Sequence, residues 1–160
     1  MPLNRTSITS PLRIDVVQVP GAGGLIGMTL CLGKKDKGVL SGPWDRDLDT
    51  DLEAIRVWGA EVLVCLVEDF ELEFLHVPDL PDKAMALGIR WYHLPIVDLC
   101  APDEDFEVAW ERAGEELRGI FRVASRIMPR PFTTHTCAGS ILRVKCPGTR
   151  TFAAAWIVNC

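Results

Sequence analysis

The chain has 160 residues, of which 48% are hydrophobic and 24% charged, a balance typical of one soluble globular domain. Its net charge of −5 argues against binding to nucleic acid or to anionic membranes. The longest apolar runs, VLVCLV and FAAAWIV, are far shorter than the ~20 residues of a membrane-spanning helix. The polar first 15 residues contain no apolar signal segment, so we expect a cytoplasmic protein.

The cysteines support the same setting. There are six, with no CxxC pair and no zinc-type spacing. Cys31 and Cys65 lie inside apolar runs, where a thiol behaves as a small hydrophobic side chain. We therefore predict free thiols in a reducing compartment, and neither a metal nor another cofactor.

Two strands are expected at the start of the chain. The runs RIDVVQV (13–19) and LIGMTLCL (25–32) are apolar and rich in branched residues, and PGAGG separates them. The glycines of GAGGLIG (21–27) resemble a dinucleotide-binding turn, but a strand rather than a helix follows them. A hairpin turn is the better interpretation.

A helix is predicted next, over 50–59. Thr50 is placed to cap it, Glu53 is the capping-box partner, and Gly59 ends it. The continuous apolar run that follows, 60–68, is typical of a strand in the middle of a parallel or mixed sheet.

The remaining pattern continues this alternation. Residues 69–88 are helical in character, 89–97 form an apolar strand, and 103–124 have apolar positions at a period near 3.6 with an acidic first turn. We expect an α/β fold with a mostly parallel central sheet flanked by helices. Arg46, ahead of the first long helix, is expected to be a structural or surface residue, with a phosphate contact as the alternative.

The charge distribution changes abruptly near residue 118. All 22 acidic residues precede that point, whereas 119–160 contain six Lys or Arg and no Asp or Glu. We interpret 1–160 as a single domain, with a well-patterned part (1–118) and a divergent basic tail (119–160). The tail is either an anion-binding face or the product of an altered reading frame.

One spacing in the tail has chemical meaning. Cys137 and Arg143 are separated by five residues. Cysteine-dependent hydrolysis of phosphate esters uses a thiolate at the base of a short loop, whose N–H groups, here including those of Gly139 and Ser140, hold the phosphate. An arginine at the end of the loop binds two phosphoryl oxygens. The alternative is a chance spacing.

Such chemistry also needs an acid for the leaving group. Asp98 follows the apolar strand 89–97 directly and is our candidate. The ordinary alternative is a turn residue whose carboxylate caps a helix. His93, on the same strand, is expected to be a core histidine with its hydrogen bonds satisfied.

Several segments resemble the kinase-associated type of dual-specificity phosphatase. They are GMTLCLGKKD, RDLDTDLEAIRVWGAEVLVCLVEDFEL and ALGIRWYHLPIVDLCAPD, the last containing the specific element HLPIVD. The resemblance implies a cysteine-dependent phosphatase fold, with the C-terminal helices truncated or altered here. It also implies a phosphorylated protein or small phosphate ester as substrate, and Asp98 as general acid. Thr136, Leu142 and Val144 depart from the family's signature loop, so the alternative is a catalytically inactive phosphatase-like binding domain.

Overall fold

Five strands form one sheet in the computed structural model, which describes residues 4–18, 24–37, 42–98, 100–127 and 153–157. Across the sheet the order is β1 (Asp15–Gln18), β2 (Leu25–Thr29), β7 (Ala153–Ile157), β5 (Ala60–Cys65) and β6 (Arg90–His93). β1 pairs with β2 in the antiparallel sense, and every other pair is parallel. The predicted α/β class with a mostly parallel sheet is confirmed.

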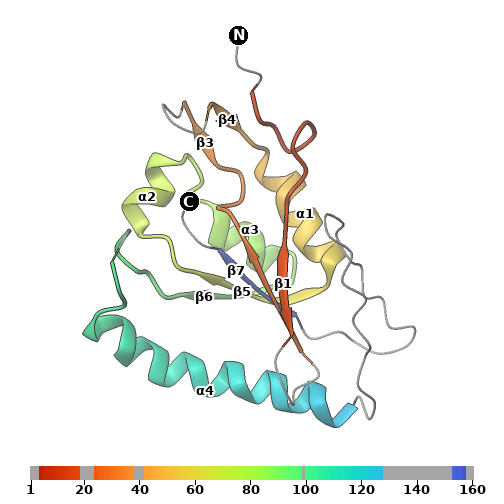
Figure 1. Ribbon diagram of the computed structural model, residues 1–160, viewed down its shortest axis with the longest axis vertical. Coiled ribbons are helices and arrows are strands. Elements are labelled where there is room, and N and C mark those ends of the chain that lie inside the picture. Colours follow the sequence, from red (N-terminus) through yellow and green to blue (C-terminus); the bar gives the residue numbers. More distant parts are fainter. Residues whose placement is uncertain (1–3, 19–23, 38–41, 99, 128–152, 158–160) are drawn as a thin grey trace.

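Helices cover both faces of this sheet (Figure 1). The described helices are α1 (Leu48–Trp58), α2 (Asp69–Phe74), α3 (Leu80–Ala86) and α4 (Glu104–Ile127). The first three lie on one face and α4 crosses the other. A small hairpin of β3 (Lys35–Asp36) and β4 (Trp44–Asp45) follows β2 and stands apart from the main sheet.

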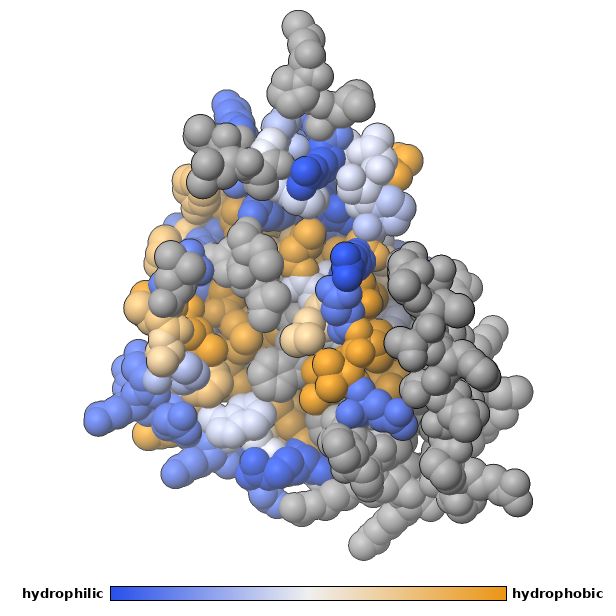
Figure 2. All heavy atoms as spheres, in the orientation of Figure 1, coloured by the Kyte–Doolittle hydropathy of each residue, from blue (hydrophilic) through white to orange (hydrophobic). Residues whose placement is uncertain are grey.

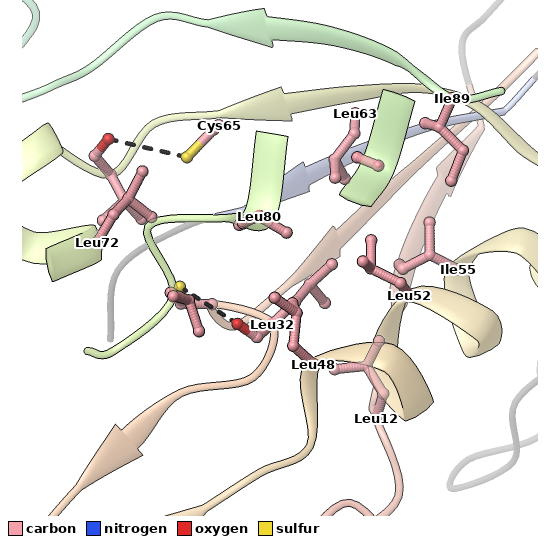
Figure 3. Packing of buried hydrophobic residues seen from close by; sticks show 14 of the residues in the cluster. Leu12, Leu32, Leu48, Leu52, Ile55, Leu63, Cys65, Leu72, Leu80 and Ile89 are labelled. Atoms are coloured by element: carbon pink, nitrogen blue, oxygen red, sulfur yellow. Dashed lines mark hydrogen bonds between the residues drawn. The ribbon is translucent and has the colours of Figure 1, made fainter. Parts of the chain in front are cut away.

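Two apolar cores result, one on each face. The larger lies between the sheet and α1–α3, and Figure 3 shows leucines such as Leu52, Leu63 and Leu80 meeting there from different elements. The smaller joins Val62 and Val64 of β5 to Leu117 and other apolar side chains of α4. Alternate residues of β5 thus serve opposite cores, as the two-residue period of a strand requires.

α4 is amphipathic in the way its sequence period predicts. Ala113 and Leu117 are buried against the sheet, whereas Glu104, Glu111 and Glu115 are exposed. Figure 2 shows the corresponding hydrophilic surface along the lower edge of the molecule. This helix begins one residue later than predicted and continues to Ile127, three residues beyond the predicted end and well past the charge boundary near residue 118.

α1 begins earlier than predicted, and Thr50 is not its cap. The N-cap is Asp47, whose Oδ1 accepts hydrogen bonds from the Thr50 N–H at 2.8 Å and the Thr50 hydroxyl at 2.6 Å. Glu53 binds Arg56 instead of closing a capping box. The predicted stop at Gly59 is confirmed, with φ of 97° and its N–H bonded to two carbonyls of the last turn.

The strand predicted over 89–97 is also shorter than expected. β6 ends at His93, after which the chain bonds to the last residue of β5 and to the first residue of the loop that follows it. Pro95 has no backbone N–H, and the amides on either side of it, those of Leu94 and Ile96, donate to the carbonyls of Cys65 and Leu66.

The middle of the sheet is formed by the tail. β7 lies between β2 and β5, and its five residues are in register with Leu25–Thr29. The tail therefore contributes a strand that both halves of the sheet pair with, although residues 128–152 and 158–160 lie outside the described part.

Candidate functional site

The carboxyl ends of the four parallel strands meet at one edge of the sheet. Thr29, Cys65 and His93 are the last residues of β2, β5 and β6. Thr29 and Cys65 both pair with Ile157, the last residue of β7, and His93 pairs with Cys65. In open α/β sheets, ligands bind beyond this edge, in the loops that follow the strands. The site is therefore sought there.

Asp98 lies in such a loop. It occupies a turn closed by the Cys100 N–H and the Val97 carbonyl, at 3.0 Å, and its side chain is exposed. The turn follows β6 after a short connection, so the carboxylate lies beyond the carboxyl edge of the sheet and faces solvent. This position suits a group that must reach a bound ligand.

Asp98 is a turn residue, as the ordinary alternative predicted, but it does not cap α4. The carboxylate at the start of α4 belongs to Asp103, whose Oδ1 accepts a hydrogen bond from the Phe106 N–H at 2.9 Å. The Asp103 carbonyl also accepts the first helical bond, from Glu107, at 3.0 Å. The Asp98 carboxylate is therefore not used to cap α4.

The segment that leads from β6 to Asp98 is hydrogen-bonded to the end of β5 and to the loop that follows β5. The Leu94 N–H donates to the Cys65 carbonyl and the Ile96 N–H to the Leu66 carbonyl, both at 2.9 Å. The His93 ring adds a third link, because its Nε2 lies 2.8 Å from the Val67 carbonyl. The predicted hydrogen bond of this histidine is confirmed at Nε2, but the side chain is 25% exposed and so His93 is not a core residue.

The two buried cysteines near this edge, Cys31 and Cys65, are not activated. Cys65 is buried and its thiol donates to the Val67 carbonyl at 3.8 Å (Figure 3). Burial raises the pKa of Cys65 and, together with the charge of Cys65 nearby, that of Cys31, each to about 12. A thiol that stays protonated at neutral pH is a poor nucleophile, so neither residue is a candidate for covalent catalysis.

Among the described residues, Thr29 holds the one buried side-chain polar atom that lacks a hydrogen-bond partner. Its Oγ1 is buried and has no hydrogen-bond partner within the described part of the chain.

The other predicted site residues are not covered by the described ranges. Cys137, Gly139, Ser140 and Arg143 all fall within 128–152. The structure therefore places Asp98 and leaves its predicted partners as predictions.

Arg46 is a structural residue. Its guanidinium is 1% exposed and bonds to both carboxylate oxygens of Asp51, so it is not offered to a phosphate. Sequence reasoning did not pair these two residues; the signal available was an Arg and an Asp five apart at the start of a helix.

The nucleotide-binding interpretation of GAGGLIG also fails. β2 begins at Leu25, and a Cβ at Gly27 would lie 2.7 Å from both Ile14 and Trp58. Gly27 therefore permits close packing of α1 on the sheet.

A cavity of about 450 Å³ opens between the β3–β4 hairpin and the end of α2. Trp44, Phe74 and His76 line it together with Lys35 and Lys37. The hairpin follows β2 and α2 follows β5, so this cavity lies at the carboxyl edge of the sheet, as the Asp98 turn does.

No group of three or more His, Cys, Asp or Glu side chains in the described ranges could hold a metal ion. No helix in the same ranges is both long and apolar enough to span a bilayer.

The fold is similar to that of a solved phosphatase. The chain is similar to the crystal structure of kinase associated phosphatase with its catalytic-site cysteine substituted by serine, with a TM-score of 0.63 and 19% sequence identity. The similarity covers 92% of this chain and 66% of the phosphatase, so this chain spans just under two thirds of that protein. No family model and no curated protein matches the sequence.

Proposed function

We propose that this protein is a cysteine-dependent protein phosphatase of the dual-specificity or tyrosine type. It would hydrolyse phosphate monoesters of a phosphorylated protein through a phosphocysteine intermediate. The observation that carries the proposal is the position of Asp98, exposed in a turn beyond the carboxyl edge of a parallel sheet with a phosphatase fold.

In the proposed reaction, the Cys137 thiolate attacks phosphorus and the bond to the ester oxygen breaks. Asp98 gives its proton to that oxygen as it leaves. Arg143 and the N–H groups of Gly139 and Ser140 would neutralise the phosphoryl oxygens. Asp98, now a carboxylate, then accepts a proton from the water that releases phosphate from cysteine. The cycle needs no redox partner and returns the enzyme to its starting state.

Two observations support a protein substrate in a reducing compartment. The cavity lined by Trp44, Phe74 and His76 is large enough for a side chain of a peptide that flanks the phosphorylated residue. Cys31, Cys65 and Cys100 are free, as expected in the cytoplasm.

The test is hydrolysis of an aryl phosphate and of phosphotyrosine and phosphothreonine peptides by the purified chain. Asp98→Asn should lower turnover by about 100-fold or more, the usual contribution of a general acid. Cys137→Ser should abolish turnover, and inorganic phosphate should protect Cys137 from alkylation. Absence of turnover above background in the unmodified chain contradicts the proposal.

Cys160→Ser is the matched control for the nucleophile. Cys160 follows β7 by three residues in the sequence, and β7 ends at the same edge of the sheet as the strands around the site. The proposal expects Cys160→Ser to retain activity. Loss of activity in Cys160→Ser with retention in Cys137→Ser would move the nucleophile to Cys160.

A further inference from the structure

Three hydrogen bonds fasten the chain between β6 and Asp98, and one of them comes from a side chain. The Leu94 and Ile96 amides bond to the carbonyls of Cys65 and Leu66. The third bond joins His93 Nε2 to the Val67 carbonyl at 2.8 Å. Beyond Ile96 the chain turns at Val97–Cys100, which carries Asp98 into solvent.

The chemistry of the His93 contact defines its direction. A carbonyl oxygen has no proton to give, so the ring must donate from Nε2, which fixes the tautomer of the neutral histidine. The side chain is 25% exposed, and its Nδ1 lies 3.7 Å from Oδ1 of Asp69, which is 90% exposed. The ring of Trp91 lies 6.2 Å away, centroid to centroid, on the same strand. The imidazole is thus held between β6 and the segment that enters α2.

The His93 bond differs from the two main-chain bonds in the segment that it reaches. The Leu94 and Ile96 bonds both end on residues 65 and 66, whereas the His93 bond reaches one residue further, to the start of the loop into α2. The His93 bond thus resists a rotation of the Asp98 turn away from the sheet. A displacement of about 1 Å in a reacting group can cost about 100-fold in rate.

We propose that His93 positions the Asp98 turn, by tying the end of β6 to the Val67 carbonyl. This inference rests on the proposed function, since it gives Asp98 the role of general acid. His93 itself touches no reacting atom and is a positioning residue.

The test uses two esters that differ in their need for an acid. The leaving group of p-nitrophenyl phosphate departs easily as an anion, whereas that of phenyl phosphate is as basic as a tyrosine side chain and needs a proton. His93→Ala should lower kcat for phenyl phosphate by tenfold to about 100-fold and change kcat for p-nitrophenyl phosphate much less. His93→Gln, whose amide can donate to the same carbonyl, should restore most of the loss.

Two comparisons separate positioning from loss of structure. His93→Ala should add nothing when combined with Asp98→Asn, because the positioned group is then gone. Arg90→Ala, an exposed change at the start of the same strand, should leave both esters unaffected. Equal losses on the two esters, or additive effects of the His93 and Asp98 changes, overturn the inference.

Amide hydrogen exchange makes the test independent of turnover. His93→Ala should speed exchange at the Leu94 and Ile96 amides, and Asp98→Asn should not. If the unmodified chain hydrolyses neither ester, the proposed function fails, while unchanged exchange in His93→Ala separately overturns the tether.

Discussion

The side chains of Arg46 and Asp51 form a buried, two-pronged ion pair. Arg46 Nε lies 2.7 Å from Asp51 Oδ2, Arg46 Nη2 lies 2.8 Å from Asp51 Oδ1, and each side chain is 1% exposed. Oδ2 also accepts the Gly33 N–H at 2.9 Å, and Arg46 Nη1 donates to the Ser10 carbonyl at 2.7 Å. The pair therefore joins α1 to the turn after β2 and to the N-terminal segment.

Breaking this pair should destabilise the fold strongly. Arg46→Ala leaves the Asp51 carboxylate buried without its counter-ion, and removal of one partner of a buried pair costs about 3–5 kcal/mol. Urea denaturation measures the change. The control is Arg56→Ala, which breaks the exposed contact with Glu53 on the same helix and should barely move the midpoint. Similar midpoints for the two variants would contradict a structural role for Arg46.

Gly33 is expected to be irreplaceable for steric reasons. Its φ is +68°, and an added Cβ would lie 2.7 Å from Leu48 Cβ and 2.9 Å from Val77 Cγ1. Gly33→Ala combines backbone strain with overpacking and should cost about 2–4 kcal/mol. Gly88 has a similar φ, +77°, but open space around it, so Gly88→Ala isolates the backbone part. Equal losses in thermal denaturation would show that packing at Gly33 is unimportant.

The buried thiols should resist modification. Because burial raises the pKa of Cys31 and Cys65 from 9.0 to about 12, iodoacetamide at pH 8 should label exposed Cys100 before either of them, as mass spectrometry of the native protein can measure. Both thiols ionise more readily in the unfolded chain, so their contribution to stability is full below about pH 9 and is lost as the pH rises toward 12. Labelling of Cys65 as fast as Cys100 would refute the burial argument.

Tyr92 offers a direct optical measurement, since it is the single tyrosine of the chain. Desolvation and, after it, the hydrogen bond to the Glu116 carboxylate together raise its pKa from 10.0 to about 12. Ultraviolet absorbance should therefore show tyrosinate forming well above pH 10, and Glu116→Gln should shift the titration to lower pH. An unchanged titration in Glu116→Gln would mean that β6 and α4 do not make this contact.

β7 should be essential to the sheet. An interior strand donates backbone N–H groups to its neighbours along its whole length, and proline removes one. Ala155→Pro should therefore abolish cooperative unfolding or lower the midpoint severely. Ala155→Gly keeps the N–H and should cost only about 0.5–1 kcal/mol. Circular dichroism against urea concentration distinguishes them, and a stable Ala155→Pro protein would show that the sheet does not depend on the tail.

The element types followed from local patterns. The apolar run of 60–68 predicted β5, the 3.6-residue period of 103–124 predicted α4, and Gly59 predicted the end of α1. These features depend on neighbours in the chain, so the sequence alone predicts them. The predicted ends of elements were less exact where two nearby residues could both cap a helix. At α1 the N-cap is Asp47 rather than Thr50.

The sequence by itself determined an alternating α/β chain and marked Asp98 as a carboxylate that follows a strand. Tertiary structure alone decided that Asp103 caps α4, that Arg46 is neutralised by Asp51, and that β7 lies between β2 and β5. The candidate role of His93 depends on the hydrogen bond between its ring and the Val67 carbonyl, 26 residues away in the sequence. Such contacts join segments far apart in the chain, and their pairing depends on packing geometry that no local pattern encodes.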